Sequence, residues 1–140
     1  LDVNLEMGVA EEEGTLVYHI FDRPAFNTFS HAEAERKQQS GEHPVIDRKE
    51  ISVAPLAQIL EQHYPYDKID FMSVDVEGLD LPVLRSNNWR VYRPQLVFAE
   101  DLKRTNLLEL PASELVVFMQ SVGYVPIARL YNTLVFERSR

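Results

Sequence analysis

The stretch KIDFMSVDV, residues 68 to 76, constrains the fold more than any other part of the sequence. It is rich in large apolar and β-branched residues and has no clean alternation of apolar and polar positions, which is typical of a strand covered on both faces. Such strands belong to parallel sheets, whose neighbouring strands must be joined by long crossovers, usually helices. The sequence therefore predicts an α/β fold built around this strand.

Strand and helix patterns alternate on both sides of it. Apolar residues at helical spacing predict helices, and β-rich runs predict further strands. The predicted helices span 54–63, 80–86 and 113–122, with a short helix at 31–39 in a long polar loop. The predicted strands span 2–9, 16–21, 45–53, 94–101, 124–130 and 133–137, with a hairpin-like turn at Glu13-Gly14 between the first two. We expect a single domain, residues 1–140, with a mostly parallel sheet that ends in an antiparallel hairpin.

Composition disfavours several function classes. The formal net charge of −8 and the absence of a dense basic stretch argue against a nucleic-acid backbone or an anionic membrane as partner. There are no cysteines, so neither a disulfide framework nor a thiolate zinc site is expected, and the four histidines lack metal-ligand spacing. No apolar run approaches the ~20 residues of a membrane helix, and nothing at the start resembles a secretion signal. These features predict a cytoplasmic protein.

Two acids and a glycine follow the central strand, where an apolar core would otherwise close. Ligands of open α/β sheets bind beyond the carboxyl ends of the strands, where Asp75, Glu77 and Gly78 are predicted to lie. In an extended chain, Asp75 and Glu77 would point to the same side about 7 Å apart. Such a pair can supply a general base, because like charges raise the pKa of one member, or can share a hard cation. The structural alternative is that Glu77 or Asp80 merely favours the positive end of the next helix.

The block KIDFMSVDVEGLDLPVLRSNNWRVYRPQLVFAE closely resembles the central part of the FkbM-type methyltransferases. Three further stretches resemble parts of the same family: GVAEEEGTLVYHIFDRPAFNTFS, VAPLAQIL and GYVPIARLYNTLVFER. The resemblance implies the doubly wound, Rossmann-like fold of class I methyltransferases. It also implies methyl transfer from S-adenosylmethionine to a hydroxyl of a small-molecule or sugar-like acceptor.

The attacking hydroxyl of such an acceptor must lose its proton, and a neighbouring carboxylate can take it. Asp75 is the first candidate for this base or for orienting the acceptor. Glu77 is the second candidate, and Glu100, at the end of the neighbouring predicted strand, is the third.

The resemblance also implies contacts for the cofactor and the acceptor. Gly8, Val9 and Ala10 would lie against the adenine, and Asp75 and Val76 would contact the cofactor from the central strand. Asn27 and Thr28 would help to cover the site. No resident metal ion is expected, although a metal-assisted form that uses Asp75 and Glu77 as ligands is an alternative.

Part of the family pattern has no counterpart in the sequence. No G-x-G occurs, and the glycine-rich turn and ribose-binding acid that follow the first two strands of the family are missing. We therefore expect about 60 residues, two strand–helix units, ahead of Leu1. Their loss would expose a sheet edge, which favours self-association and weak or absent binding of S-adenosylmethionine. The alternative function is a non-catalytic α/β interaction module that uses this edge.

Overall fold

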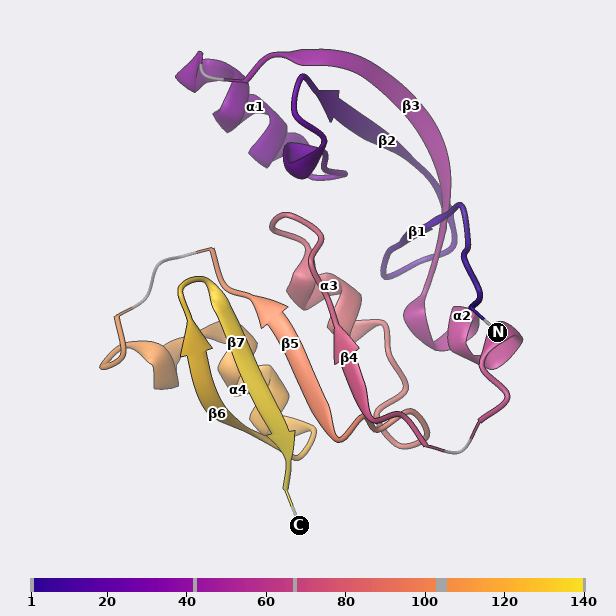
Figure 1. The fold of residues 1–140 in the computed structure, drawn as a ribbon, viewed down its shortest axis with the longest axis vertical. Helices are drawn as coiled ribbons and strands as arrows, with labels where there is room; N and C mark the ends of the chain where they lie inside the picture. Colours follow the sequence, from indigo (N-terminus) through magenta and orange to yellow (C-terminus); the bar gives the residue numbers. More distant parts are fainter. Residues whose placement is uncertain (1, 42, 67, 103–105, 140) are drawn as a thin grey trace.

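The computed structural model describes residues 2–41, 43–66, 68–102 and 106–139 and contains two sheets (Figure 1). The first sheet has the order β1-β3-β2, with β1 at Gly8–Val9, β2 at Gly14–Phe21 and β3 at Val45–Ala54. The second sheet has the order β4-β5-β7-β6, with its strands at Phe71–Ser73, Leu96–Glu100, Thr133–Arg138 and Tyr124–Leu130. The predicted α/β class is confirmed.

The sheets are mixed rather than mostly parallel, which corrects the prediction. Only β1–β3 and β4–β5 pair in parallel, whereas β2–β3, β5–β7 and β6–β7 pair antiparallel within the described residues. Parallel pairs need a crossover, and β3 returns alongside β2 instead of crossing over. The first sheet is therefore mixed and the second is largely antiparallel, with the terminal hairpin where the sequence predicts it.

The helices lie close to their predicted positions, because their end signals are local. In α1 (His31–Ser40), the Ser30 side chain accepts a hydrogen bond from the Glu33 N–H, and Gly41 ends the helix in the left-handed conformation. The other helices are α2 (Leu56–His63), α3 (Asp80–Arg85) and α4 (Glu114–Ser121), with short 3₁₀ turns η1 (Pro24–Phe26) and η2 (Leu110–Ala112). No helix within the described ranges is long and apolar enough to cross a membrane.

The core forms where α3 and α4 pack against the second sheet. Its members are buried apolar side chains from those two helices and from the strands β5, β6 and β7, together with Val74 after β4 and Trp89 after α3. Fully buried examples are Leu84, Met119, Val97, Leu134 and Phe136. Burial of this apolar surface is the main stabilising contribution to the fold.

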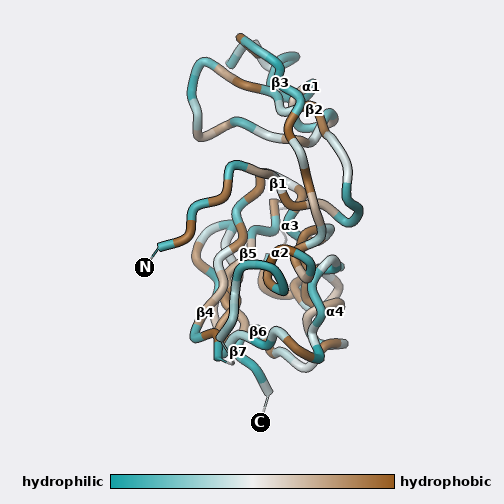
Figure 2. Tube along the Cα trace, turned by 90° about the vertical axis from the view of Figure 1, so that its right-hand side faces the viewer, coloured by the Kyte–Doolittle hydropathy of each residue, from teal (hydrophilic) through white to brown (hydrophobic). Residues whose placement is uncertain are grey.

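Two predicted strands are reduced to two or three residues. In the 2–9 stretch only Gly8–Val9 pairs, and it pairs with β3 rather than with β2, so the turn at Glu13-Gly14 joins no hairpin. Figure 2 shows the preceding segment on the outside, with alternating polar and apolar residues. The central strand is reduced to β4, an edge strand that pairs only with β5 in the described chain and leaves Phe71 64% exposed. Unpaired backbone on one side explains both losses.

The strands β2 and β3 form a long curved ribbon that carries η1 and α1 at its far end (Figure 1). We call residues 14–54 the arm. More than half of the ribbon's residues are exposed, whereas His19, Phe21, Val53 and Ala54 are buried. The arm pairs with β1 at its base, and Thr28 and Lys37 near its far end contact the turn between β4 and α3.

Candidate functional site

Three carboxylates from two neighbouring strands meet beyond the second sheet. Asp75 and Glu77 follow β4, and Glu100 is the last residue of β5. One carboxylate oxygen from each residue lies within 4.8 Å of the corresponding oxygens of the other two. Because β4 and β5 are parallel, their carboxyl ends lie at the same edge, so the fold brings together the three predicted proton acceptors. We call these residues the acid cluster.

The backbone after β4 turns instead of staying extended. Glu77 and Gly78 both have positive φ values, 50° and 96°. The left-handed region is uncommon for a residue other than glycine, so Glu77 must be held there by its surroundings. A side chain at position 78 would also meet Glu33, because an added Cβ would lie 3.0 Å from the Glu33 Cγ. The turn replaces the extended arrangement of Asp75 and Glu77 that the sequence suggests.

Two groups from the arm hold Glu77. The Thr28 hydroxyl donates to the Glu77 carbonyl at 3.2 Å, and the Lys37 ammonium donates to the Glu77 carboxylate at 2.8 Å. The Lys37 side chain is only 10% exposed. The sequence did not single out Lys37, because it lies in a charged stretch that is typical of a solvated helix. The local indication that this face of the helix is buried was Ala34, a small apolar residue one helical turn away on the same face, which is also buried.

The two predicted cover residues have different environments. Thr28 is buried, and its backbone pairs with that of His19 through two hydrogen bonds. The Asn27 side chain accepts a hydrogen bond from the Phe21 N–H at 2.9 Å, so it shapes the arm. Thr28 thus reaches the backbone of the acid cluster and Asn27 does not. Contact of either residue with an acceptor remains a prediction.

Asp80 and Glu100 are electrostatically coupled. One carboxylate oxygen of the buried Asp80 accepts a hydrogen bond from the Glu100 N–H at 2.8 Å, and the other has no partner in the described part of the chain. Burial raises the pKa of Asp80 to about 6. Burial also raises the pKa of Glu100, with further contributions from Asp75, Asp80 and Glu77. A carboxylate with a raised pKa is a stronger base near neutral pH.

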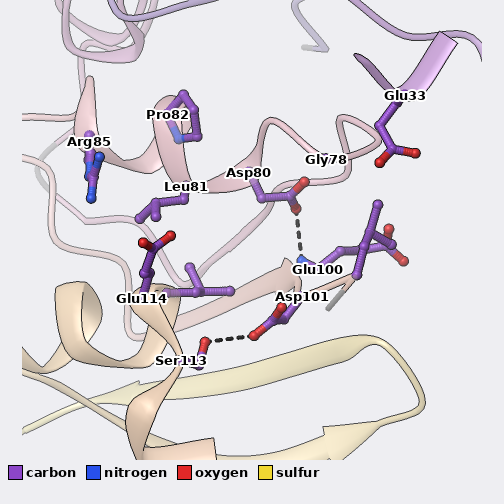
Figure 3. A pocket seen from close by; sticks show the side chains of 12 residues that line it. Glu33, Gly78, Asp80, Leu81, Pro82, Arg85, Glu100, Asp101, Ser113 and Glu114 are labelled. Atoms are coloured by element: carbon purple, nitrogen blue, oxygen red, sulfur yellow. Dashed lines mark hydrogen bonds between the residues drawn. The ribbon is translucent and has the colours of Figure 1, made fainter. Parts of the chain in front are cut away.

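A cavity of about 350 Å³ lies beside the acid cluster (Figure 3). The first turn of α3, the end of β5 and the start of α4 surround it. Glu100 belongs both to this cavity and to the acid cluster, whereas Asp75 and Glu77 do not line it. In Figure 3 the Ser113 hydroxyl donates to the Asp101 carboxylate at 2.6 Å across the cavity wall. Glu33, Asp80, Asp101 and Glu114 line the cavity as well, so Glu100 is the member of the acid cluster that is placed to meet a molecule there.

The predicted adenine contacts lie at β1. An added Cβ on the buried Gly8 would lie 2.7 Å from the Phe29 ring, so that ring already fills the space beside Gly8. The Ala10 N–H donates to the Ala54 carbonyl, and Val9 packs against the main core, as does Val76. Phe29 therefore closes the side of Gly8 on which a Cβ would lie. The cofactor roles of Gly8, Val9, Ala10, Asp75 and Val76 remain predictions.

The acid cluster could also hold a metal ion. Carboxylate oxygens within 4.8 Å of one another suit a hard divalent cation such as Ca²⁺, whose ligands lie at about 2.3–2.6 Å. Lys37 already neutralises part of the charge on Glu77, however, and a cation bound by Glu77 would compete with it. A metal-assisted mechanism therefore remains the alternative.

Comparisons with known proteins identify the family. Neither the curated proteins nor the solved structures contain a significant match to this chain. The sequence matches the family described as the methyltransferase FkbM domain over residues 1–126, which is most of its length. The acid cluster lies within the matched region. The chain therefore belongs to the FkbM methyltransferase family.

Proposed function

We propose that this protein transfers a methyl group from S-adenosylmethionine to a hydroxyl of a small-molecule or sugar-like acceptor. The observation that carries the proposal is the acid cluster, in which Asp75, Glu77 and Glu100 converge within a sequence that matches a methyltransferase family. The cofactor would supply a methyl group activated by its sulfonium. The protein must supply the position of the acceptor and a destination for its proton.

Glu100 and Asp75 are the proposed proton acceptors. Glu100 gains support from its half-buried position, its raised pKa and its place in the 350 Å³ cavity. Asp75 is exposed and lies in the same cluster, so it could take the proton or orient the hydroxyl. Glu77 is paired with Lys37 and is the least available of the three.

The donor side of the reaction needs more than the described residues provide. We propose that strand–helix units carrying a glycine-rich turn complete it, since the sequence has no G-x-G and Phe29 fills the space beside Gly8. Helix N-termini after glycine-rich turns are common binding elements for such cofactors. On this proposal the 140 residues alone bind S-adenosylmethionine weakly or not at all, and calorimetry that measured micromolar binding would overturn it.

Radiolabelled methyl transfer by the full-length protein tests the function. Wild type should label a hydroxylated acceptor, and Glu100→Gln and Asp75→Asn should each lower kcat by about 10²-fold, the usual scale for loss of a general base. Glu61→Gln is the matched control, because Glu61 is an exposed acid on α2 away from the cluster. Failure to label hydroxylated acceptors, or full activity of both acid variants, would contradict the proposal.

A non-catalytic interaction module is the second candidate. The outer edge of β4 is unpaired in the described chain, and Phe71 is 64% exposed beside it. Unpaired edges of this kind favour pairing with another strand, and we propose a second copy of the chain as the partner. Light scattering should then detect dimers of wild type and monomers of Phe71→Lys. Monomers at every wild-type concentration would exclude this function.

A further inference from the structure

Lys37 is a buried cation beside a cluster of acids. Its ammonium lies 2.8 Å from the Glu77 carboxylate, 3.5 Å from the Phe26 carbonyl oxygen and 4.8 Å from the centre of the Phe26 ring. The Phe21 ring lies 5.8 Å away on the same arm. Burying an ammonium is unfavourable unless such groups compensate it. Residues of the arm therefore form a specific binding environment for the Lys37 ammonium.

Lys37 also contacts the turn after β4, through Glu77. Glu77 has a left-handed backbone, which needs support from its surroundings. Lys37 holds its carboxylate while Thr28 holds its carbonyl oxygen, so the same residue is fixed at both ends. Buried ion pairs contribute little net stability, and their better-supported role is to select one geometry. The placement of Lys37 indicates a role in orienting this turn.

Besides Lys37, several charged groups interact with Glu77 or Glu100. Asp75 lies on the same turn, Glu100 on β5, Asp80 on α3, and Arg36 on α1. Arg36 pairs with Glu33 at 2.6 Å and is 66% exposed, so solvent screens its charge. Within the described ranges, Lys37 is the cation that forms an ion pair with the cluster. Its loss would leave three adjacent carboxylates without this compensation.

We propose that Lys37 is a positioning residue of the methyl-transfer site: by binding Glu77 it fixes the turn after β4 and leaves Asp75 and Glu100 to receive the acceptor proton. The inference rests on the proposed function and assigns the three acids different tasks. Glu77 is an anchor, and the other two acids face the reacting hydroxyl. Lys37 acts through Glu77 and touches no reacting atom.

Carboxyl titrations by NMR test the link without any cofactor. In full-length Lys37→Met, the carboxyl resonance of Glu100 should titrate at a higher pH than in wild type, because the positive charge of Lys37, which lowers the pKa of Glu100, is lost. Lys37→Arg should restore most of the wild-type titration. Lys68→Met is the matched control, since Lys68 forms an exposed ion pair with Asp70 at 2.7 Å. Unchanged titrations in Lys37→Met would overturn the proposal.

Kinetics test the positioning role. Lys37→Met should lower kcat about tenfold, leave the acceptor KM nearly unchanged and move the acid limb of the kcat profile to higher pH. Lys37→Arg should recover most of kcat. The double variant Lys37→Met/Glu77→Gln should be no slower than Glu77→Gln alone, because each single change already removes the Lys37–Glu77 ion pair. Losses that multiply, or an acid limb that does not move, would overturn the role.

The titration and kinetic experiments together separate failure of this inference from failure of the proposed function. An inactive wild type with shifted titrations in Lys37→Met would contradict the methyltransferase proposal, and the positioning role with it, and support only the ion-pair link. An active wild type with unchanged titrations would support the methyltransferase proposal and contradict the role of Lys37.

Discussion

The second sheet and the arm are held together by different interactions. In the sheet, β5 and β7 bury Val97, Ala99, Leu134 and Phe136 against α3 and α4. In the arm, apolar residues of the ribbon such as Val17 and Ile46 are 43% and 63% exposed. A two-stranded ribbon that buries so little is marginally stable by itself. The sheet therefore supplies most of the apolar burial.

The arm is instead held against the turn after β4 by a few directional contacts. Lys37 and Thr28 bind Glu77, and Glu33 packs against Gly78. Such contacts depend on distance and angle, so they specify geometry more than they add stability. The candidate site lies where the two regions meet. Substitutions in the second sheet should therefore affect global stability, while substitutions in the arm should affect the turn after β4.

The largest expected effect comes from removing a core aromatic ring. Phe136→Ala should lower the free energy of unfolding by about 3–5 kcal/mol, because Phe136 is fully buried in the second sheet. Phe21→Ala, at an equally buried position in the arm, should instead increase hydrogen exchange locally in residues 14–54. Denaturant unfolding and hydrogen exchange measure the two effects. Equal global losses would mean that the arm and the sheet unfold as one unit.

Asp80→Asn should stabilise the protein above pH 6. Because burial raises the pKa of Asp80 from 3.8 to about 6, the folded state keeps its proton longer than the unfolded state. Stability from this group is therefore present below pH 3.8 and lost as the pH rises through about 6. Asparagine keeps the acceptor for the Glu100 N–H, so the gain at pH 8 should be roughly 2–3 kcal/mol. Urea unfolding at pH 4 and pH 8 tests this; an equal gain at both values contradicts it.

Gly78→Ala tests the junction of the arm with the turn. Alanine must adopt φ near 96° and its Cβ would lie 3.0 Å from the Glu33 Cγ, so a loss of about 2 kcal/mol is expected. Gly41→Ala is the matched control, because Gly41 also has a positive φ but has open space around its Cβ position. Thermal unfolding should show a larger loss for Gly78→Ala. Equal losses would mean that contact with Glu33 has no consequence.

Thr28→Val should loosen the turn at a smaller cost. It removes the hydroxyl that donates to the Glu77 carbonyl and accepts from the Ser30 N–H, which should cost about 1 kcal/mol. Amide exchange should increase around Glu77. Thr15→Val, at an exposed position of β2, should leave exchange there unchanged. Unchanged exchange in Thr28→Val would show that Thr28 does not anchor the turn.

The smallest effect concerns the pH dependence of the arm. Burial, followed by the charge of Arg48 and by His31, lowers the pKa of His19 below 6.5. The folded state thus resists protonation, and stability present above pH 6.5 is lost as the pH falls below it. His19→Gln should remove this loss between pH 7.5 and pH 5.5, as measured by urea unfolding. The direction is opposite to that of Asp80, and an unchanged pH slope would contradict it.

Local patterns predicted much of the secondary structure. Ser30 and Gly41 mark the ends of α1, and the terminal hairpin lies where its turn residues predict. Strand pairing was less predictable, because the apolar run at 68–76 does not reveal which neighbours it will have. A run suited to burial on both faces forms an edge strand when a neighbour is present on one side alone.

Some residues of the candidate site could be predicted from local patterns, and others could not. Asp75, Glu77 and Glu100 could be predicted, since acids at the ends of neighbouring parallel strands must lie at one edge of a sheet. The ion pair of Lys37 could not, because 40 residues separate it from Glu77 and the helical face that Lys37 shares with Ala34 indicates burial without indicating a partner. Its burial depends on how the arm folds back onto the turn.

The amino-acid sequence alone determined the family, the α/β class and the positions of the acids, because these depend on short patterns and local end signals. The tertiary structure decided the mixed sheets, the left-handed turn at Glu77 and the ion pair with Lys37. These features require contacts between distant segments. A contact of that kind forms only when the packing of the whole chain places both partners together, and no single stretch of residues encodes it.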